Sequence, residues 1–133
     1  MMAEPLRLPY RLLRGRLSPV VRVILFHNRA YSLESAYVDT GAAYSIFTPD
    51  VAEELSMDWR SGYPTSITGL EGRRVILFLH SVGLRIGDFH IRAEVGFSDQ
   101  LGIGFNLLGR HSIFNQLQFC FNDRDGELLV SRL

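Results

Sequence analysis

The sequence predicts an all-β domain with one or two short helices, and three observations support this fold class. Runs rich in β-branched and aromatic residues recur along the chain, separated by the turn-forming residues Gly, Pro, Asn and Asp. Residues 82–97 alternate apolar with polar or small side chains about a two-residue turn, which is typical of an antiparallel hairpin. Only residues 48–55 and 110–115 have the pattern of a helix, and both segments are short.

The length and composition of the chain favour a single domain without excess charge. A chain of 133 residues, 47% of them hydrophobic, can bury one core but hardly two. Lys plus Arg total 14 and Asp plus Glu total 14, so net charge does not attract the protein to nucleic acid or to an anionic membrane. Cys120 is the single cysteine and the sequence contains no apolar run of membrane-spanning length and no secretory signal, so we expect a soluble, cytoplasmic protein.

The first 18 residues are expected to form an N-terminal arm, ahead of a domain that spans residues 19–133. Residues 6–8 and 12–13 are short apolar patches that lie between Pro and Gly helix breakers. An arm of this kind can pair with another strand or contribute to a dimer contact. A disordered tail is the alternative.

Two predicted strands lead to the most informative motif in the chain. Residues 19–26 are rich in β-branched side chains and predict a strand, residues 27–30 a turn, and residues 31–38 a second strand. The second strand runs directly into Asp39-Thr40-Gly41. The hairpin is therefore expected to present the Asp39 carboxylate at its end.

This tripeptide allows two interpretations. An enzyme can display a carboxylate in this way, at the end of a strand in a loop where the backbone turns sharply. An ordinary strand-ending turn has the same residues, because Asp and Thr bond their own backbone and Gly supplies a positive φ. A given tripeptide of this kind occurs by chance in roughly 3% of chains of this length, so the surrounding sequence must decide.

The segment after the loop predicts a short helix over residues 48–55. Thr48 is a candidate N-cap hydroxyl, Pro49 suits the first helical position, and the following acidic residues lie near the positive end of the helix dipole. Val51 and Leu55 are four residues apart and should face the core.

A flexible hairpin is predicted next. Residues 66–68 and 75–79 resemble strands, and the turn between them begins at Gly69 and includes Gly72. A plain surface hairpin and a flap that closes over bound substrate have the same pattern.

The hairpin over residues 82–97 has the most clearly defined register. The Gly87-Asp88 turn pairs Ile86 with Phe89, Leu84 with Ile91 and Val82 with Ala93, so one face is wholly apolar. Arg85 and His90 share the other, solvated face. Residues 116–122 and 127–133 predict a closing hairpin around Asp125-Gly126.

Residues 39–48, the short acidic helix after them, and Asn106-Leu107-Leu108-Gly109-Arg110 together resemble the retropepsin-like aspartic proteases. The resemblance spans about residues 19 to 133. It implies a closed β-barrel or sandwich that works as a C2 homodimer. It also implies the site residues: a catalytic Asp39, an active-site loop of Thr40, Gly41 and Ala42, and a substrate-binding flap of Gly69, Leu70, Glu71 and Gly72.

The resemblance also implies roles for residues around the loop. Thr40 would bond across the two loops of the dimer, Gly41 would let the backbone approach, and residues 107–109 would pack beneath the loop. Ala43 departs from the family, which commonly has Ser, Thr or Asp there, whereas Ser45 matches a hydroxyl position.

Peptide hydrolysis without a metal needs both a general base and a general acid, and two carboxylates that share one proton can supply both. None of the other aspartates is followed by Thr-Gly or Ser-Gly at the end of a buried strand. These aspartates are Asp50, Asp58, Asp88, Asp99, Asp123 and Asp125. A C2 homodimer would place Asp39 beside its symmetry mate. We therefore expect an aspartic endopeptidase that hydrolyses peptide or protein substrates as a homodimer, without a cofactor or metal.

Two other functions remain open on the sequence alone. One is a binding or dimerisation module that keeps the retropepsin-like fold without catalysis, which the departure at Ala43 and the unusual flap sequence leave possible. The other is a small β-barrel that binds a ligand or metal. Its support is weak because the four histidines are dispersed along the chain: His27, His80, His90 and His111.

Nucleotide and nucleic-acid binding are poorly supported. Residues 104–109 superficially match a phosphate-binding loop, but Arg110-His111 follows where Lys and then Ser or Thr are required. Arg73-Arg74 is a pair of basic residues rather than a basic patch.

Overall fold

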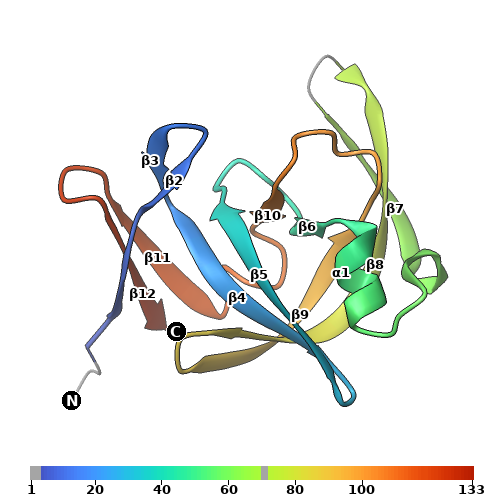
Figure 1. Ribbon diagram of the computed structural model, residues 1–133, viewed down its shortest axis with the longest axis horizontal. Coiled ribbons are helices and arrows are strands. Elements are labelled where there is room, and N and C mark those ends of the chain that lie inside the picture. The colour runs from blue at the N-terminus through green and yellow to red at the C-terminus, as the bar shows by residue number, and fades with distance from the viewer. Residues whose placement is uncertain (1–3, 70–71) are drawn as a thin grey trace.

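The computed structural model describes residues 4–69 and 72–133, and strands dominate it (Figure 1). The strands are β1 (Leu6–Pro9), β2 (Arg11–Leu13), β3 (Arg16–Ser18), β4 (Val20–His27), β5 (Ala30–Val38), β6 (Ile46–Phe47), β7 (Tyr63–Thr68), β8 (Arg74–Ile86), β9 (Phe89–Phe97), β10 (Asn106–Leu108), β11 (Leu117–Asn122) and β12 (Glu127–Arg132). The helix α1 (Pro49–Glu54) and a 3-10 turn at Trp59–Ser61 complete the described elements. The predicted all-β fold is confirmed. Within the described ranges, no helix is long and apolar enough to cross a membrane.

The main sheet closes on itself. Its seven strands run in the order β4-β5-β10-β6-β9-β8-β7, and β4 also pairs with β8. This extra pairing aligns Leu25 with Leu84 and Phe26 with Gly83. Gly83 leaves room for it, because a Cβ there would lie 3.3 Å from the Cβ of Phe26. A barrel results, and the β7–β8 hairpin projects from it (Figure 1).

The core fills this barrel. Its largest fully buried side chains include Phe47, Phe97, Leu25 and Leu84. A smaller apolar cluster of Ile46, Val75, Leu77 and Leu107 lies at the base of the projecting hairpin. β6 and β10 are short strands that are wholly buried and pair with each other. They therefore anchor the loop that follows β5 to the apolar interior.

The hairpin predicted over residues 82–97 is confirmed. All three predicted apolar pairs occur in the observed register of β8 and β9, and Arg85 lies opposite His90. β8 is longer than predicted, because one continuous strand replaces the two runs expected at residues 75–79 and 82–86. Its first half pairs with β7 and its second half with β9.

Two details of the predicted helices are wrong. Residues 110–115 form successive turns rather than a helix, because Ser112 adopts a left-handed φ of 59° that interrupts helical backbone. Thr48 occupies the N-cap of α1, but its hydroxyl donates to the Asp50 side chain instead of capping the backbone. Pro49 begins the helix as predicted.

The described part of the N-terminal segment, residues 4–18, consists mainly of paired strands, so a disordered tail is wrong for this part. β1 pairs with β12 along its whole length, in a three-stranded sheet of order β1-β12-β11. β2 and β3 form a separate two-stranded hairpin. Figure 1 shows this hairpin above the start of β4 and the end of β5.

Candidate active site

Asp39 lies immediately beyond the end of β5. The last residue of the strand, Val38, is 2% exposed and pairs in parallel with Leu108 of β10. The Asp39 amide then donates to the Leu108 carbonyl at 3.0 Å, which continues the ladder by one residue. The sheet thus delivers this carboxylate to a surface loop from a strand whose last residue is buried.

The loop itself is a tight turn closed by the aspartate. The Gly41 amide donates to Asp39 Oδ1 at 2.8 Å, and the Ala42 amide donates to the Asp39 carbonyl at 3.2 Å. Gly41 is not in the left-handed region, so the positive φ considered from the sequence is wrong. Close packing favours the glycine instead, because a Cβ there would lie 3.3 Å from Asp39 Oδ1, a tight contact.

The segment 106–111 holds the loop from below. The Arg110 amide donates to the Ala42 carbonyl at 3.0 Å and the His111 amide to the Ala43 carbonyl at 2.8 Å. The Gly109 amide donates to the hydroxyl of Ser45, a fully buried side chain, at 2.9 Å. The structure therefore brings the Leu-Leu-Gly segment and the Asp-Thr-Gly loop together, and Ser45 is their polar support.

Gly109 fits only because it lacks a side chain. A Cβ at this position would lie 2.9 Å from the Ala42 carbonyl oxygen and closer still to that of Tyr44. Both contacts are with backbone, which cannot rotate away.

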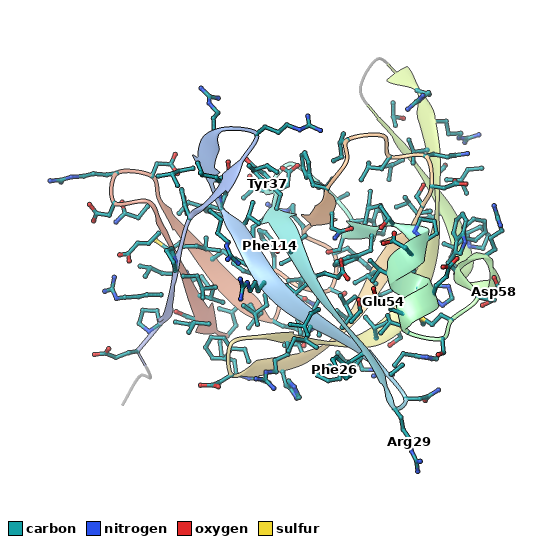
Figure 2. The ribbon with its side chains drawn as sticks, in the orientation of Figure 1. Phe26, Arg29, Tyr37, Glu54, Asp58 and Phe114 are labelled. Carbon is teal, nitrogen blue, oxygen red and sulfur yellow. The ribbon has the colours of Figure 1, made fainter. Side chains whose placement is uncertain are left out.

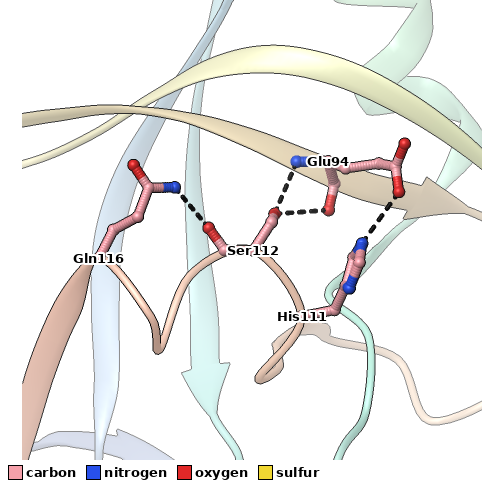
Figure 3. A network of polar contacts seen from close by, with 4 residues as sticks. All are labelled: Glu94, His111, Ser112 and Gln116. Carbon is pink, nitrogen blue, oxygen red and sulfur yellow. Dashed lines mark hydrogen bonds and ion pairs between the residues drawn. The ribbon is translucent and has the colours of Figure 1, made fainter.

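The turns that follow are fixed to β9 by a polar network (Figure 3). The Glu94 amide donates to the Ser112 hydroxyl at 2.7 Å, and His111 Nε2 lies 2.9 Å from Glu94 Oε1. Gln116 donates its side-chain amide to the Ser112 carbonyl and to the Arg92 carbonyl. Because these turns bond the Asp39 loop, the network holds the loop against the barrel.

Of the other predicted loop residues, Thr40 and Gly41 face solvent, whereas Ala42 is half-buried against the smaller apolar cluster. Thr40, Gly41 and Ala43 are exposed, and the Thr40 hydroxyl has no hydrogen-bond partner within residues 4–69 and 72–133. The guanidinium of Arg110 approaches the Thr40 carbonyl at 3.5 Å and lies over the ring of Phe114. Arg110 has no ion-pair partner in the part of the chain that the structure describes, and its neighbour Ala43 has no charged group to supply one.

The predicted flap coincides with the β7–β8 hairpin. The Gly69 amide donates to the Arg73 carbonyl at 2.7 Å, and Gly72 turns the chain with a φ of +74°. Leu70 and Glu71 lie outside the described residues. The Ile76 amide donates to the side chain of Gln100 at 3.0 Å, which ties the stem of the hairpin to the loop before β10.

A cavity of about 710 Å³ lies beside Asp39 and includes residues that the sequence did not indicate. Three segments line it: residues 16–19, residues 37–40, and the end of β11 with the turn after it, residues 121 and 123–126; Tyr10 also lines it. The N-terminal arm and the C-terminal turn are far apart in sequence, so no local pattern could bring them to this site.

Two aspartates of this cavity already have partners. Tyr10 donates its hydroxyl to Asp123 at 2.7 Å, and Asp125 accepts from the Asn122 side chain at 3.0 Å. Burial of its ring raises the pKa of Tyr10, and the hydrogen bond to Asp123 raises this pKa further. Neither aspartate stands in a loop like that of Asp39.

No metal centre is found at the site or elsewhere in the described chain, where no three His, Cys, Asp or Glu side chains gather with the geometry to hold an ion.

The comparison with known proteins covers the segments that form the Asp39 loop and its support. Residues 32–111, more than half of the chain, match the protein family described as aspartyl protease. No match is found among curated protein sequences.

Two solved structures resemble the fold. The retropepsin-like aspartic protease from Rickettsia conorii matches with a TM-score of 0.62 and 20% identity over 96% of this chain and 91% of its own. The EIAV protease complexed with the inhibitor HBY-793 matches with a TM-score of 0.55 and 24% identity over 75% of this chain and 88% of its own. At these identities the structural matches establish the retropepsin-like fold.

Proposed function

Because the chain belongs to the aspartyl protease family, we propose that it is an endopeptidase in which the Asp39 carboxylates of two identical subunits form the catalytic pair. One observation carries this proposal: the strand end, the Ser45 hydroxyl and the turns after Gly109 build a rigid loop around a single carboxylate. A rigid support of this kind holds a catalytic group in place before substrate arrives.

The proposed chemistry uses one proton shared by two carboxylates. Like charges a few Å apart cannot both ionise, so one Asp39 stays protonated while the other is a base. The base takes a proton from water as the water oxygen bonds to the peptide carbonyl carbon, and the acid protonates the carbonyl oxygen. When the C–N bond breaks, the departing nitrogen receives the proton that the base took from water. A hydroxyl of the tetrahedral intermediate returns its proton to the other carboxylate as the carboxyl product forms, which restores the pair.

The order of the strands supports the proposal that a second copy of the chain supplies the other carboxylate of the catalytic pair. β12 is paired on both sides, by β1 and by β11, whereas β11 has no partner on its other edge within the described residues. Exposed edges usually carry charges or proline, which prevent pairing. β1 carries Arg7 and Pro9, but β11 reads Leu-Gln-Phe-Cys-Phe-Asn, without either.

The location of β11 supports the same conclusion. The turns that bond to Ala42 and Ala43 lead directly into this strand, so its free edge is linked rigidly to the Asp39 loop. Antiparallel pairing of β11 with its copy would have two-fold symmetry, as a dyad of identical loops requires.

Substitution of Asp39 by Asn tests the catalytic role. Asn keeps the size of the side chain and an oxygen that can accept from Gly41, but it cannot act as a base, so cleavage of a peptide substrate should fall at least about a hundredfold while the fold survives. Peptide cleavage and a thermal melt measure both properties. A statine-type peptide, which mimics the tetrahedral transition state, should inhibit the unmodified protein.

Asp50→Asn is the matched control, because Asp50 is an exposed aspartate in the first turn of α1. It should cleave as the unmodified protein does. If Asp39→Asn retains full cleavage, the catalytic assignment is wrong. A folded protein that cleaves no peptide would instead be a binding module with this fold.

A further inference from the structure

The cavity beside Asp39 has one wall that comes from the N-terminal hairpin. Arg16, Leu17 and Ser18 of β3 line it from one side, and Tyr37 with the Asp39 loop lines it from another. Figure 2 shows Tyr37 near the end of β5, close to this hairpin. The β2–β3 hairpin is therefore part of the cavity that holds the catalytic carboxylate.

The tip of the hairpin is built to stay in place. Arg14 and Gly15 form its two-residue turn with φ of 52° and 79°, a geometry that Asn or Gly adopts more readily than Arg. The Arg14 side chain offsets this cost, since its guanidinium donates to the Ile103 carbonyl and lies 5.3 Å from the centre of the Phe105 ring.

The base of the hairpin is held as firmly. The Tyr10 amide donates to the Gly126 carbonyl at 2.7 Å, and the Tyr10 hydroxyl donates to Asp123 at 2.7 Å. On the opposite side, the Phe105 ring that Arg14 covers lies 5.9 Å from the ring of Tyr37. Arg14, Phe105 and Tyr37 thus connect the hairpin to the strand that ends at Asp39.

Two leucines of the hairpin are equally open to solvent but differently placed. Leu12 and Leu17 lie directly opposite each other in the register, at 72% and 65% exposure. Leu17 lines the cavity with Asp39, whereas Leu12 does not. An aliphatic side chain left open inside a cavity is a surface that a ligand can cover favourably.

Apart from Asp39, the cavity wall carries no net charge, and it also offers apolar and aromatic side chains. Besides Asp39 it contains two arginines, Arg16 and Arg124, and two aspartates, Asp123 and Asp125, so these charges cancel. The remaining large surfaces are Leu17, Pro19, Tyr37 and Phe121, which are apolar or aromatic.

We propose that the β2–β3 hairpin is a specificity-determining wall of the substrate cleft, and that Leu17, which lines the cavity together with Tyr37, binds a large apolar side chain of the peptide close to the scissile bond. This inference rests on the proposed protease function. It makes the N-terminal segment a part of the site rather than an appendage of the domain.

Leu17→Ala tests the wall, with Leu12→Ala as the matched control on the same hairpin. The substrates are a set of peptides in which each residue near the scissile bond is changed in turn from Leu to Ala. At one position the unmodified protein should prefer Leu, and Leu17→Ala should lower that preference in kcat/KM about fivefold. Leu12→Ala should keep it.

Arg14→Asn provides a second variant that keeps the hairpin. Asn suits the left-handed turn, so β2 and β3 should still pair, but the contacts to Ile103 and Phe105 are lost. The same Leu preference should then fall, chiefly through KM, because the wall is no longer fixed. If Leu17→Ala and Leu12→Ala leave the preference equal, the inference is overturned.

Binding of the same peptides to Asp39→Asn, measured by calorimetry, separates this inference from the proposed catalysis. Cleavage by the unmodified protein with no effect of Leu17→Ala refutes the wall alone. Absence of cleavage, with a Leu preference in binding that depends on Leu17, refutes catalysis and supports the wall. If peptides are neither cleaved nor bound, both proposals fail.

Discussion

At the scale of single residues, the loop around Asp39 depends on positions where the backbone tolerates no added atom. Gly109 is such a position, and at Gly41 an added Cβ would make a tight contact with the Asp39 carboxylate; neither glycine is needed for a left-handed φ. Gly109 is the more tightly enclosed, because carbonyl oxygens of Ala42 and Tyr44 face the space where a Cβ would stand.

Gly109→Ala should therefore destabilise the protein by more than about 2 kcal/mol, since a methyl group at this position displaces backbone of the Asp39 loop. Urea unfolding measures this change. Gly72→Ala is the control, because a Cβ there meets nothing within 4 Å and only its φ of +74° is unfavourable. It should cost about 1 kcal/mol. Equal effects of the two substitutions would contradict the packing argument.

The residues of this loop are also where the sequence was most informative. Asp39-Thr40-Gly41 and the Leu-Leu-Gly segment could be associated from their resemblance to a family, and the structure brings them together. The resemblance implied that Gly41 allows a close approach of the backbone, but its contact with Asp39 Oδ1 could not be predicted, because that contact depends on the three-dimensional path of the loop.

At the scale of elements, local pairings were predictable and distant ones were not. The 82–97 hairpin was predicted in register because its turn and its alternation lie within a few residues of each other. The pairing of β1 with β12 joins the two ends of the chain, and nothing in the Pro-interrupted sequence of residues 5–9 indicates its partner. Consequently the arm was expected as a separate segment, and its contribution to the cavity was missed.

The hydrogen bond between Tyr10 and Asp123 makes the attachment of this arm sensitive to high pH. The pKa of Tyr10 is raised in the folded state by burial and by Asp123, whereas an unfolded tyrosine ionises near pH 10. The stability that Tyr10 contributes is thus fully present below about pH 10 and is lost as the pH rises above the unfolded value.

Unfolding free energies measured between pH 8 and pH 11 test this expectation. The free energy of unfolding of the unmodified protein should fall above about pH 10, and the part of its slope against pH that is due to Tyr10 corresponds to at most one proton released on unfolding. Tyr10→Phe lacks the ionisable group and should show a smaller loss over the same range, although it starts from a lower stability. Identical slopes for the two proteins would show that Tyr10 does not titrate on unfolding.

At the scale of the whole molecule, the fold is a closed barrel that presents the Asp39 loop at its surface. Closure of the barrel depends on the pairing of β4 with β8. No sequence pattern predicted this pairing, because the Asp39 loop, α1 and β7 are among the segments that separate the two strands in the chain. The barrel leaves Thr40 and Gly41 exposed beside a cavity, and it leaves the uncharged edge of β11 without a partner in the described chain. A second copy of the chain would cover the exposed loop and pair with this edge, and would leave the cavity to the substrate.

The most direct test of this account mixes unmodified subunits with a ninefold excess of Asp39→Asn subunits. The Asp39→Asn subunits carry a uniform 15N label, so that native mass spectrometry can confirm exchange; most unmodified chains would then be paired with an inactive partner. If the site needs Asp39 from both copies, activity per unmodified chain should fall to about one tenth, while the same excess of serum albumin leaves it unchanged. Full activity per unmodified chain after complete exchange would contradict the shared site.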